Sequence, residues 1–167
     1  MSEQVSAGYL RQLNDAVADL VTRPAIRGVV DTLKEQLQHT SGPFVWSTID
    51  LKSVTTPLPA DIKSGWIFVL KKDVPSGCHY HPNSVQHMVM IEGQGTSKVG
   101  TNAGRMNLFD AQGYALDENW YVIPAGVPHE FFPEGRDVVV MSFHTCDTDE
   151  LEEIRCDSGA SRNYETG

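Results

Sequence analysis

The amino-acid sequence predicts an all-β barrel or sandwich behind an N-terminal helical hairpin. Residues 3–39 carry apolar side chains at helical spacing, whereas from residue 44 onward short β-type runs alternate with turn residues. The chain has 167 residues, of which 40% are hydrophobic and 21% are charged. This length and composition are typical of one globular domain with a sizeable core.

Two apolar stripes predict the helical hairpin. The stripes consist of Leu10, Leu13, Val17, Leu20 and Val21, followed by Ile26, Val29, Val30, Leu33 and Leu37. Pro24 separates them at a position that suits the first residue of a helix, and Gly42 with Pro43 ends the second helix. We expect residues 1–41 to pack on the barrel and to help form a homodimer, because two stripes exceed what one barrel flank requires.

Eight short runs predict the strands of a barrel over residues 42–146. The runs read FVWSTID, GWIFVLKK, CHYH, HMVMIEG, TSKVG, NWYVIPAG, HEFFPEG and DVVVMSFHT. Closely spaced short strands with Gly, Pro and Asn between them are typical of all-β barrels and sandwiches. Residues 147–167 are acidic, polar and small, and we expect them to form a partly disordered tail.

Charge and cysteine content narrow the function class and the compartment. The formal net charge of −9 argues against a nucleic-acid partner, which would require a basic face. No apolar stretch approaches the roughly 20 residues of a membrane span, and the first residues do not resemble a secretory signal. Three cysteines without metal-type spacing then favour the reducing cytoplasm, with no membrane partner.

The stretch "GCHYHPNSVQH", residues 77–87, holds three of the six histidines. Residues two apart on a strand point to the same side, so His79 and His81 share a face. Cys78 takes the other side, where we expect a packed thiol. The turn that follows leads to Gln86; if Gln86 faces inward, His87 faces outward.

These residues resemble the two motifs of the cupin superfamily. The first motif, G(X)5HXH(X)3,4E(X)6G, is matched by His79, His81 and Gly93, with Gln86 in the place of the glutamate. The second, G(X)5PXG(X)2H(X)3N, is matched by the segment "PAGVPH" that ends at His129. The second motif departs from the pattern at its first glycine and at its asparagine. The resemblance implies a double-stranded β-helix, the cupin jelly-roll barrel, over about residues 44–145.

The resemblance also implies one divalent metal ion on His79, His81, Gln86 and His129. An amide oxygen at position 86 is a neutral and weaker ligand than a carboxylate. A divalent ion bound by three imidazoles and an amide keeps its charge uncompensated, which favours an anionic or chelating substrate. His144 ends an apolar strand whose facing the sequence leaves open, so its role as a ligand is also open.

The function that we expect is that of a metal-dependent enzyme acting on a small organic molecule. Some cupin dioxygenases lack the glutamate, and the resemblance therefore favours dioxygen-dependent oxidation with Fe(II). The alternatives are Lewis-acid chemistry with Zn (an isomerase, lyase or cyclase resembling certain cupin polyketide cyclases) and a non-enzymatic ligand-binding or sensor cupin. Ni and Mn are further metal candidates. The expected substrate pocket is lined by Trp66, Phe68, Met88, Met90, Tyr121, Phe131, Met141 and Phe143.

Overall fold

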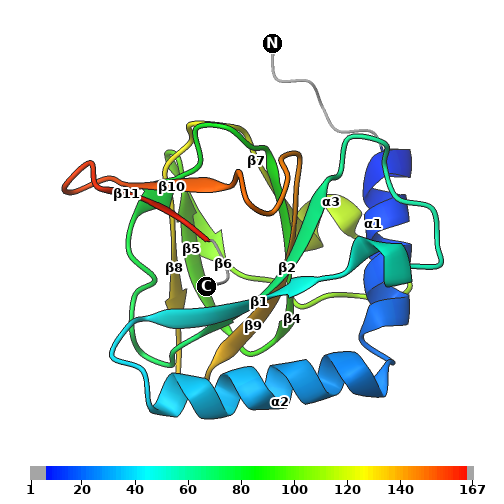
Figure 1. Cartoon of the computed structure of the whole chain (residues 1–167), viewed down its shortest axis with the longest axis horizontal. Coiled ribbons are helices and arrows are strands. Elements are labelled where there is room, and N and C mark those ends of the chain that lie inside the picture. The colour runs from blue at the N-terminus through cyan, green and yellow to red at the C-terminus, as the bar shows by residue number, and fades with distance from the viewer. Residues whose placement is uncertain (1–6, 165–167) are drawn as a thin grey trace.

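A computed structural model describes residues 7–164 of the chain, and two N-terminal helices accompany two antiparallel sheets in it (Figure 1). The helices are α1 (Ala7–Leu20), α2 (Pro24–Gln38), the short 3-10 helix η1 (Leu51–Ser53) and α3 (Leu116–Asn119). The strands are β1 (Phe44–Ile49), β2 (Ser64–Leu70), β3 (His79–Tyr80), β4 (Gln86–Glu92), β5 (Gly95–Val99), β6 (Asn102–Arg105), β7 (Trp120–Ile123), β8 (His129–Pro133), β9 (Val138–His144), β10 (Glu152–Arg155) and β11 (Ser161–Asn163).

The two sheets form a jelly-roll barrel, as the sequence predicted. One sheet has the strand order β1-β2-β9-β4-β7, and the other has the order β11-β10-β3-β8-β5-β6. Strands that are neighbours in a sheet are mostly distant in sequence, which is typical of double-sheet jelly rolls. The space between the sheets holds one apolar core, which includes Trp66, Met88 and Phe131.

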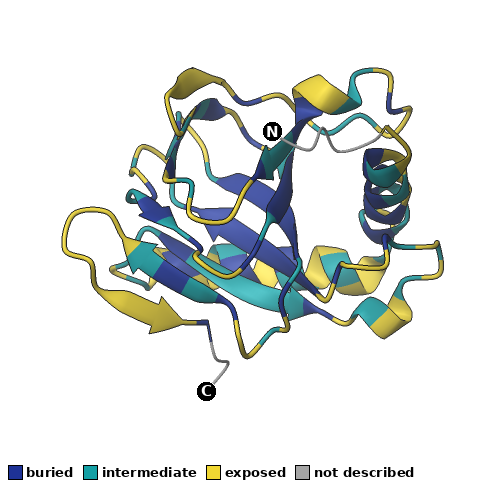
Figure 2. Cartoon of the chain, turned by 90° about the horizontal axis from the view of Figure 1, so that it is seen from above, coloured by how far each residue is buried: buried dark blue, intermediate teal, exposed yellow. Residues whose placement is uncertain are grey.

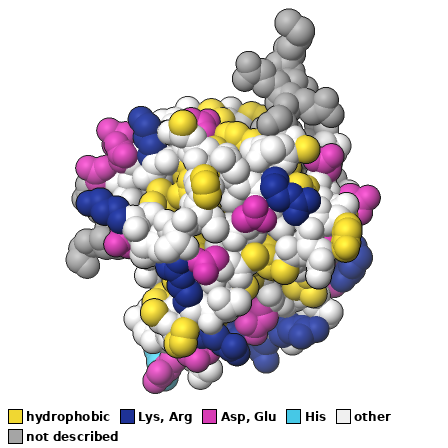
Figure 3. All heavy atoms as spheres, turned by 90° about the vertical axis from the view of Figure 1, so that its right-hand side faces the viewer, with side chains coloured by type: hydrophobic (Ala, Val, Ile, Leu, Met, Phe, Trp, Pro, Cys, Tyr) yellow, Lys and Arg dark blue, Asp and Glu magenta, His cyan; other side chains and the backbone are white. Residues whose placement is uncertain are grey.

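The first sheet is buried on both faces because the helical hairpin covers its outer side (Figure 2). Leu13, Val17 and Leu33 of the helices pack in one cluster with outward-facing residues such as Val89 and Val139. The two apolar stripes therefore cover the barrel. On the face that carries α1, acidic and basic side chains are interspersed with hydrophobic ones (Figure 3). The homodimer stays a prediction.

The end of the described chain forms a hairpin, where we expected an acidic tail over 147–167. Strands β10 and β11 pair with each other, and β10 continues the sheet by pairing with β3. Two apolar side chains hold this hairpin: Leu151 and Tyr164 are 0% and 1% exposed. The polar composition of the segment conceals these two anchors, and residues 165–167 of the expected tail lie outside the described residues.

A disulfide joins Cys78 beside β3 to Cys156 beside β10, which corrects the expectation that Cys78 is a packed thiol. Cys146 is free and buried. Disulfides are rare in reducing compartments. The cytoplasmic location stays a prediction. Within the described residues, none of the helices is both long and apolar enough to cross a membrane.

Candidate metal centre

Three histidine side chains converge inside the barrel. His79 and His81 belong to β3 and its end, and His129 begins β8, the strand next to β3. His79 and His129 are direct cross-strand partners, so their side chains lie side by side. One ligand atom of each of the three rings lies within 4.8 Å of the others. Three buried imidazoles at this spacing could hold one metal ion.

Each of these rings is oriented by a backbone carbonyl group. The Nδ1 atoms of His79, His81 and His129 donate to the carbonyl oxygens of Gly77, Glu152 and Val127, at 3.0, 2.8 and 3.0 Å respectively. A carbonyl oxygen can only accept, so each Nδ1 carries the proton. In the neutral ring Nε2 then carries the free lone pair, and this arrangement is typical of histidines that bind a metal.

Burial keeps the three rings uncharged at neutral pH. Desolvation is the main cause that lowers the pKa of His79 and His81 to about 4. Desolvation, followed by the proximity of His79 and His81, also lowers the pKa of His129 well below its usual range. The buried Nε2 atom of His129 has no hydrogen-bond partner within the described part of the chain. A neutral imidazole with an unpaired, buried lone pair is suited to a cation.

Gln86 opens β4 and contributes to the wall of the same cavity. Its Nε2 atom lies 3.6 Å from the sulfur of Met88, while its buried Oε1 atom has no hydrogen-bond partner among residues 7–164. An unpaired amide oxygen costs about 1–3 kcal/mol when it is removed from water. A metal ion, or water bound to one, would satisfy this oxygen, so the donor set fits a divalent ion. The ligand roles of Gln86 and the three histidines stay predictions.

The other two histidines of the barrel, His87 and His144, make hydrogen bonds within the protein. His144 is inward-facing and fully buried; its Nδ1 and Nε2 lie 2.8 and 3.1 Å from the hydroxyl oxygens of Ser84 and Ser142. The His144 ring therefore supports the neighbouring His81 ring, 5.2 Å away, and has no nitrogen to spare for a metal. His87 lies on the outer side of the sheet, buried beneath Tyr9 of α1.

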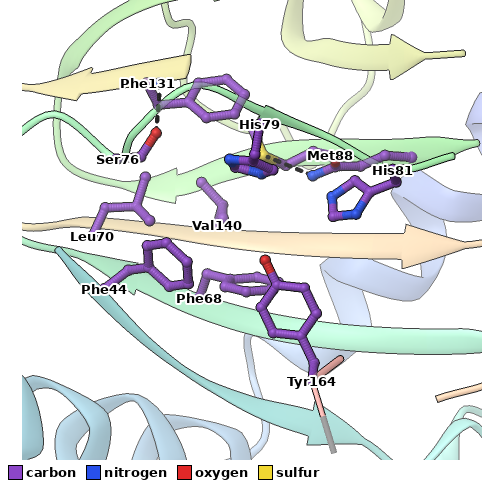
Figure 4. Close-up of a pocket in the computed structure, with 11 residues that line it drawn as sticks. Phe44, Phe68, Leu70, Ser76, His79, His81, Met88, Phe131, Val140 and Tyr164 are labelled. Carbon is purple, nitrogen blue, oxygen red and sulfur yellow. Dashed lines mark hydrogen bonds between the residues drawn. The ribbon is translucent and has the colours of Figure 1, made fainter. Parts of the chain in front are cut away.

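A small cavity of about 30 Å³ lies beside the histidines, with room for on the order of one or two water molecules (Figure 4). Its walls are largely apolar. Lining residues are Phe44, Phe68, Leu70, Ser76, His79, His81, Gln86, Met88, Phe131, Val140 and Tyr164. The hydroxyl group of Tyr164 points toward the histidines, so the residue that follows the C-terminal hairpin forms part of the cavity wall (Figure 4).

The structure places only part of the expected pocket at this cavity. Of the eight predicted residues, Phe68, Met88 and Phe131 line it. Trp66 and Met90 lie in the same interior core, and Tyr121 packs against that core. The prediction for Met141 and Phe143 is wrong, because both point outward and pack under the helices.

Two residues that sequence reasoning missed contribute to the centre. Tyr164 lines the cavity, and the buried carboxylate of Glu153 lies 3.9 Å from Nε2 of His79. Both belong to the segment that we expected to be a tail. In the run "ELEEIR" Leu151 lies two residues before Glu153 and therefore on the same face of a strand, but the two adjacent glutamates break any alternation of apolar and polar residues, so the sequence did not mark Glu153 as buried.

Comparisons with known proteins match the fold. No protein-family model and no curated protein matches the sequence. Among solved structures, 11S globulin from Wrightia tinctoria matches 70% of this chain and 28% of its own, with 14% identity and a TM-score of 0.52. Oxalate oxidase matches 64% of this chain and 52% of its own, with 11% identity and a TM-score of 0.47. The Cnp3 cupin domain of Schizosaccharomyces pombe matches 65% of this chain and 68% of its own, with 9% identity and a TM-score of 0.47.

This chain thus spans about a quarter of the globulin and about half of oxalate oxidase. At such identities a structural match speaks for the fold and leaves the activity open. The two-sheet barrel, the order of its strands and the globulin match agree with the motifs around His79 and His129. The chain has the fold of the cupin superfamily.

Proposed function

We propose that this protein is a metal-dependent oxygenase that holds Fe(II) on His79, His81 and His129 and acts on a small organic substrate. The observation that carries the proposal is the set of three buried rings, each with its Nδ1 proton held by a carbonyl group and its Nε2 turned to a common centre. Imidazole ligands suit iron, and three of them leave positions open for other ligands.

The protein groups around this centre have separate roles. The carbonyl groups behind the rings hold each imidazole in the tautomer that binds a metal. Phe68, Phe131 and Tyr164 give the cavity beside the centre a largely apolar wall. Bound Fe(II) would supply the reaction with dioxygen, which no amino-acid side chain activates by itself.

The substrate class follows from size and charge. The cavity is small, so a substrate of few atoms fits best unless the C-terminal hairpin moves. Arg155 and Arg162 are close enough to His79 to help lower its pKa, although desolvation is the larger cause. Both guanidinium groups are paired with carboxylates, Arg155 with Asp157 and Arg162 with Glu153, so it is the charge of a divalent ion on neutral imidazoles that favours an anionic or chelating substrate.

A second candidate is Lewis-acid chemistry with Zn. Three neutral histidines with an open fourth position are also a ligand set of catalytic zinc sites. In that case the unpaired Oε1 atom of Gln86 would accept a hydrogen bond from metal-bound water. Lyase, isomerase and cyclase reactions belong to this candidate, with no dioxygen consumed.

Metal analysis tests the proposal. Protein purified without chelators or a metal-affinity tag should contain close to one equivalent of metal, and iron with substrate-dependent oxygen consumption would support the oxygenase. Single replacements of His79, His81 or His129 by alanine should remove most of the metal, because two imidazoles hold these ions poorly. The matched control is His39→Ala, at the exposed end of α2. Full metal content in all three variants would contradict the proposed site.

A further inference from the structure

Glu153 is a buried acid beside His79, one of the three clustered histidines. The residue is 3% exposed and lies on β10, the strand that pairs with β3. Its Oε2 atom lies 3.9 Å from Nε2 of His79, the atom that faces the centre. Its position is therefore set by the same sheet that carries His79 and His129.

We propose that Glu153 is the anionic group of the metal centre and supplies the negative charge that Gln86 cannot supply at the motif's glutamate position. This inference rests on the proposed binding of a metal by the histidines. One carboxylate compensates half of the charge of a divalent ion, so the loaded site stays positive enough for an anionic or chelating substrate.

The geometry around His79 favours a cation in this place. Nδ1 of His79 already donates to the carbonyl oxygen of Gly77, so a neutral ring presents the lone pair of Nε2 toward Glu153. A lone pair and a carboxylate oxygen that face each other repel, unless a cation lies between them. The lone pair of His79 Nε2 and the carboxylate of Glu153 are thus two neighbouring electron-pair donors at the edge of the three-histidine cluster.

Arg162 holds the other side of the carboxylate. Nε of Arg162 lies 3.3 Å from Oε1 of Glu153, and Nη2 lies 3.5 Å from Oε2. The guanidinium group is half-exposed and also stacks over the ring of Tyr164, 5.1 Å from its centroid. A structural ion pair would explain the contact between Arg162 and Glu153 without any metal. The experiment must therefore separate the role of Glu153 in this ion pair from its role in metal binding.

Titration of the metal-free protein with Co(II), followed by the visible absorbance of the bound ion, measures the affinity of the site directly. Glu153→Gln keeps the shape of the side chain and removes the charge. We expect its Kd for Co(II) to rise about 10- to 100-fold, the usual effect of an outer group that tunes a metal site. The matched control is Glu152→Gln on the same strand, which removes an equal charge next to Glu153 and should leave the Kd within about 2-fold.

Two further variants separate the metal role from the ion pair. Arg162→Gln removes the competing cation, so Co(II) should bind as tightly as before or more tightly. If Glu153 served only the ion pair, Arg162→Gln and Glu153→Gln would change the affinity in the same direction. Adding Gln86→Glu to Glu153→Gln should restore most of the lost affinity, because the carboxylate then returns at the motif position.

The possible failures are distinguishable. If the unmodified protein binds no Co(II), or if the three histidine variants bind it normally, the proposed function fails. If the histidine variants lose Co(II) while Glu153→Gln keeps an unchanged Kd and melting temperature, the metal site stands and the role of Glu153 is overturned. Loss of affinity in Glu152→Gln as large as in Glu153→Gln would also overturn it.

Discussion

The bond between Cys78 and Cys156 should contribute a large part of the stability of the barrel. It closes a loop of 78 residues and joins the strand that carries His79 to the strand that carries Glu153. Cross-linking of residues this far apart removes entropy from the unfolded chain, which corresponds to about 4.5 kcal/mol at 25 °C. Small domains have total stabilities of about 5–15 kcal/mol, so the loss would be substantial.

Urea unfolding measures this contribution. The double variant Cys78→Ser/Cys156→Ser removes the bond, and Cys146→Ala is the control that leaves it in place. For a urea m-value of roughly 2 kcal/mol per molar, the midpoint of the double variant should fall by about 2 M. Reductant should lower the midpoint of the unmodified protein by a similar amount and should leave the double variant unchanged.

A thiol count checks the premise of this prediction. The chain has three cysteines, so denatured protein should react with one equivalent of thiol reagent before reduction and with three after it. Three reactive thiols in unreduced protein would show that the bond is not formed. With one reactive thiol, a midpoint shift of less than about 0.3 M would refute the loop-entropy reasoning.

Three further predictions concern the histidines and the cavity. His79 and His81 bind a proton near pH 6.5 in the unfolded chain but only near pH 4 in the folded protein. The free energy of unfolding of the metal-free protein should therefore fall by on the order of 3 kcal/mol per histidine between these two pH values. Urea unfolding from pH 7 to pH 4 measures this loss, and an unchanged urea midpoint would contradict the neutral rings. His87→Ala should lower stability by about 1–3 kcal/mol yet keep the Co(II) affinity, whereas His129→Ala should lose most Co(II) binding. Loss of Co(II) affinity in His87→Ala would shift the assignment of β4 by one residue. Tyr164→Ala should open the cavity, destabilise the protein by about 3 kcal/mol and increase acrylamide quenching of the neighbouring Trp46 and Trp66. The control Tyr164→Phe should change neither the stability nor the quenching. Equal quenching in both variants would show that Tyr164 does not cover the cavity.

Local patterns in the sequence determined the architecture. Helical spacing predicted the hairpin of α1 and α2, because one face of each helix must be apolar to pack on the barrel. Alternation along a strand placed His79 and His81 on one face, since side chains two residues apart point the same way. The second motif added His129, which β3 and β8 then bring beside His79.

The sequence did not predict which way the side chains point on a strand that is buried on both sides. The run "VVVMSFH" of β9 is apolar throughout, so it shows no alternation of polar and apolar residues. In the structure Val140 faces the barrel interior, while Met141 and Phe143 face the helices. The position of His144 between two serine hydroxyl groups follows from the same register, which only the pairing with β2 and β4 defines.

The fold class and the three candidate histidines could be predicted from the amino-acid sequence, because their signals lie in spacings of two to a few residues along the chain. The contribution of the C-terminal hairpin to the site became apparent only in the folded chain. Glu153, Tyr164 and Cys156 reach the histidines through contacts across most of the barrel sequence, as the separation of 78 residues between the bonded cysteines shows. Such contacts leave no periodic pattern, because burial of a single tyrosine or carboxylate depends on partners that the local sequence does not contain.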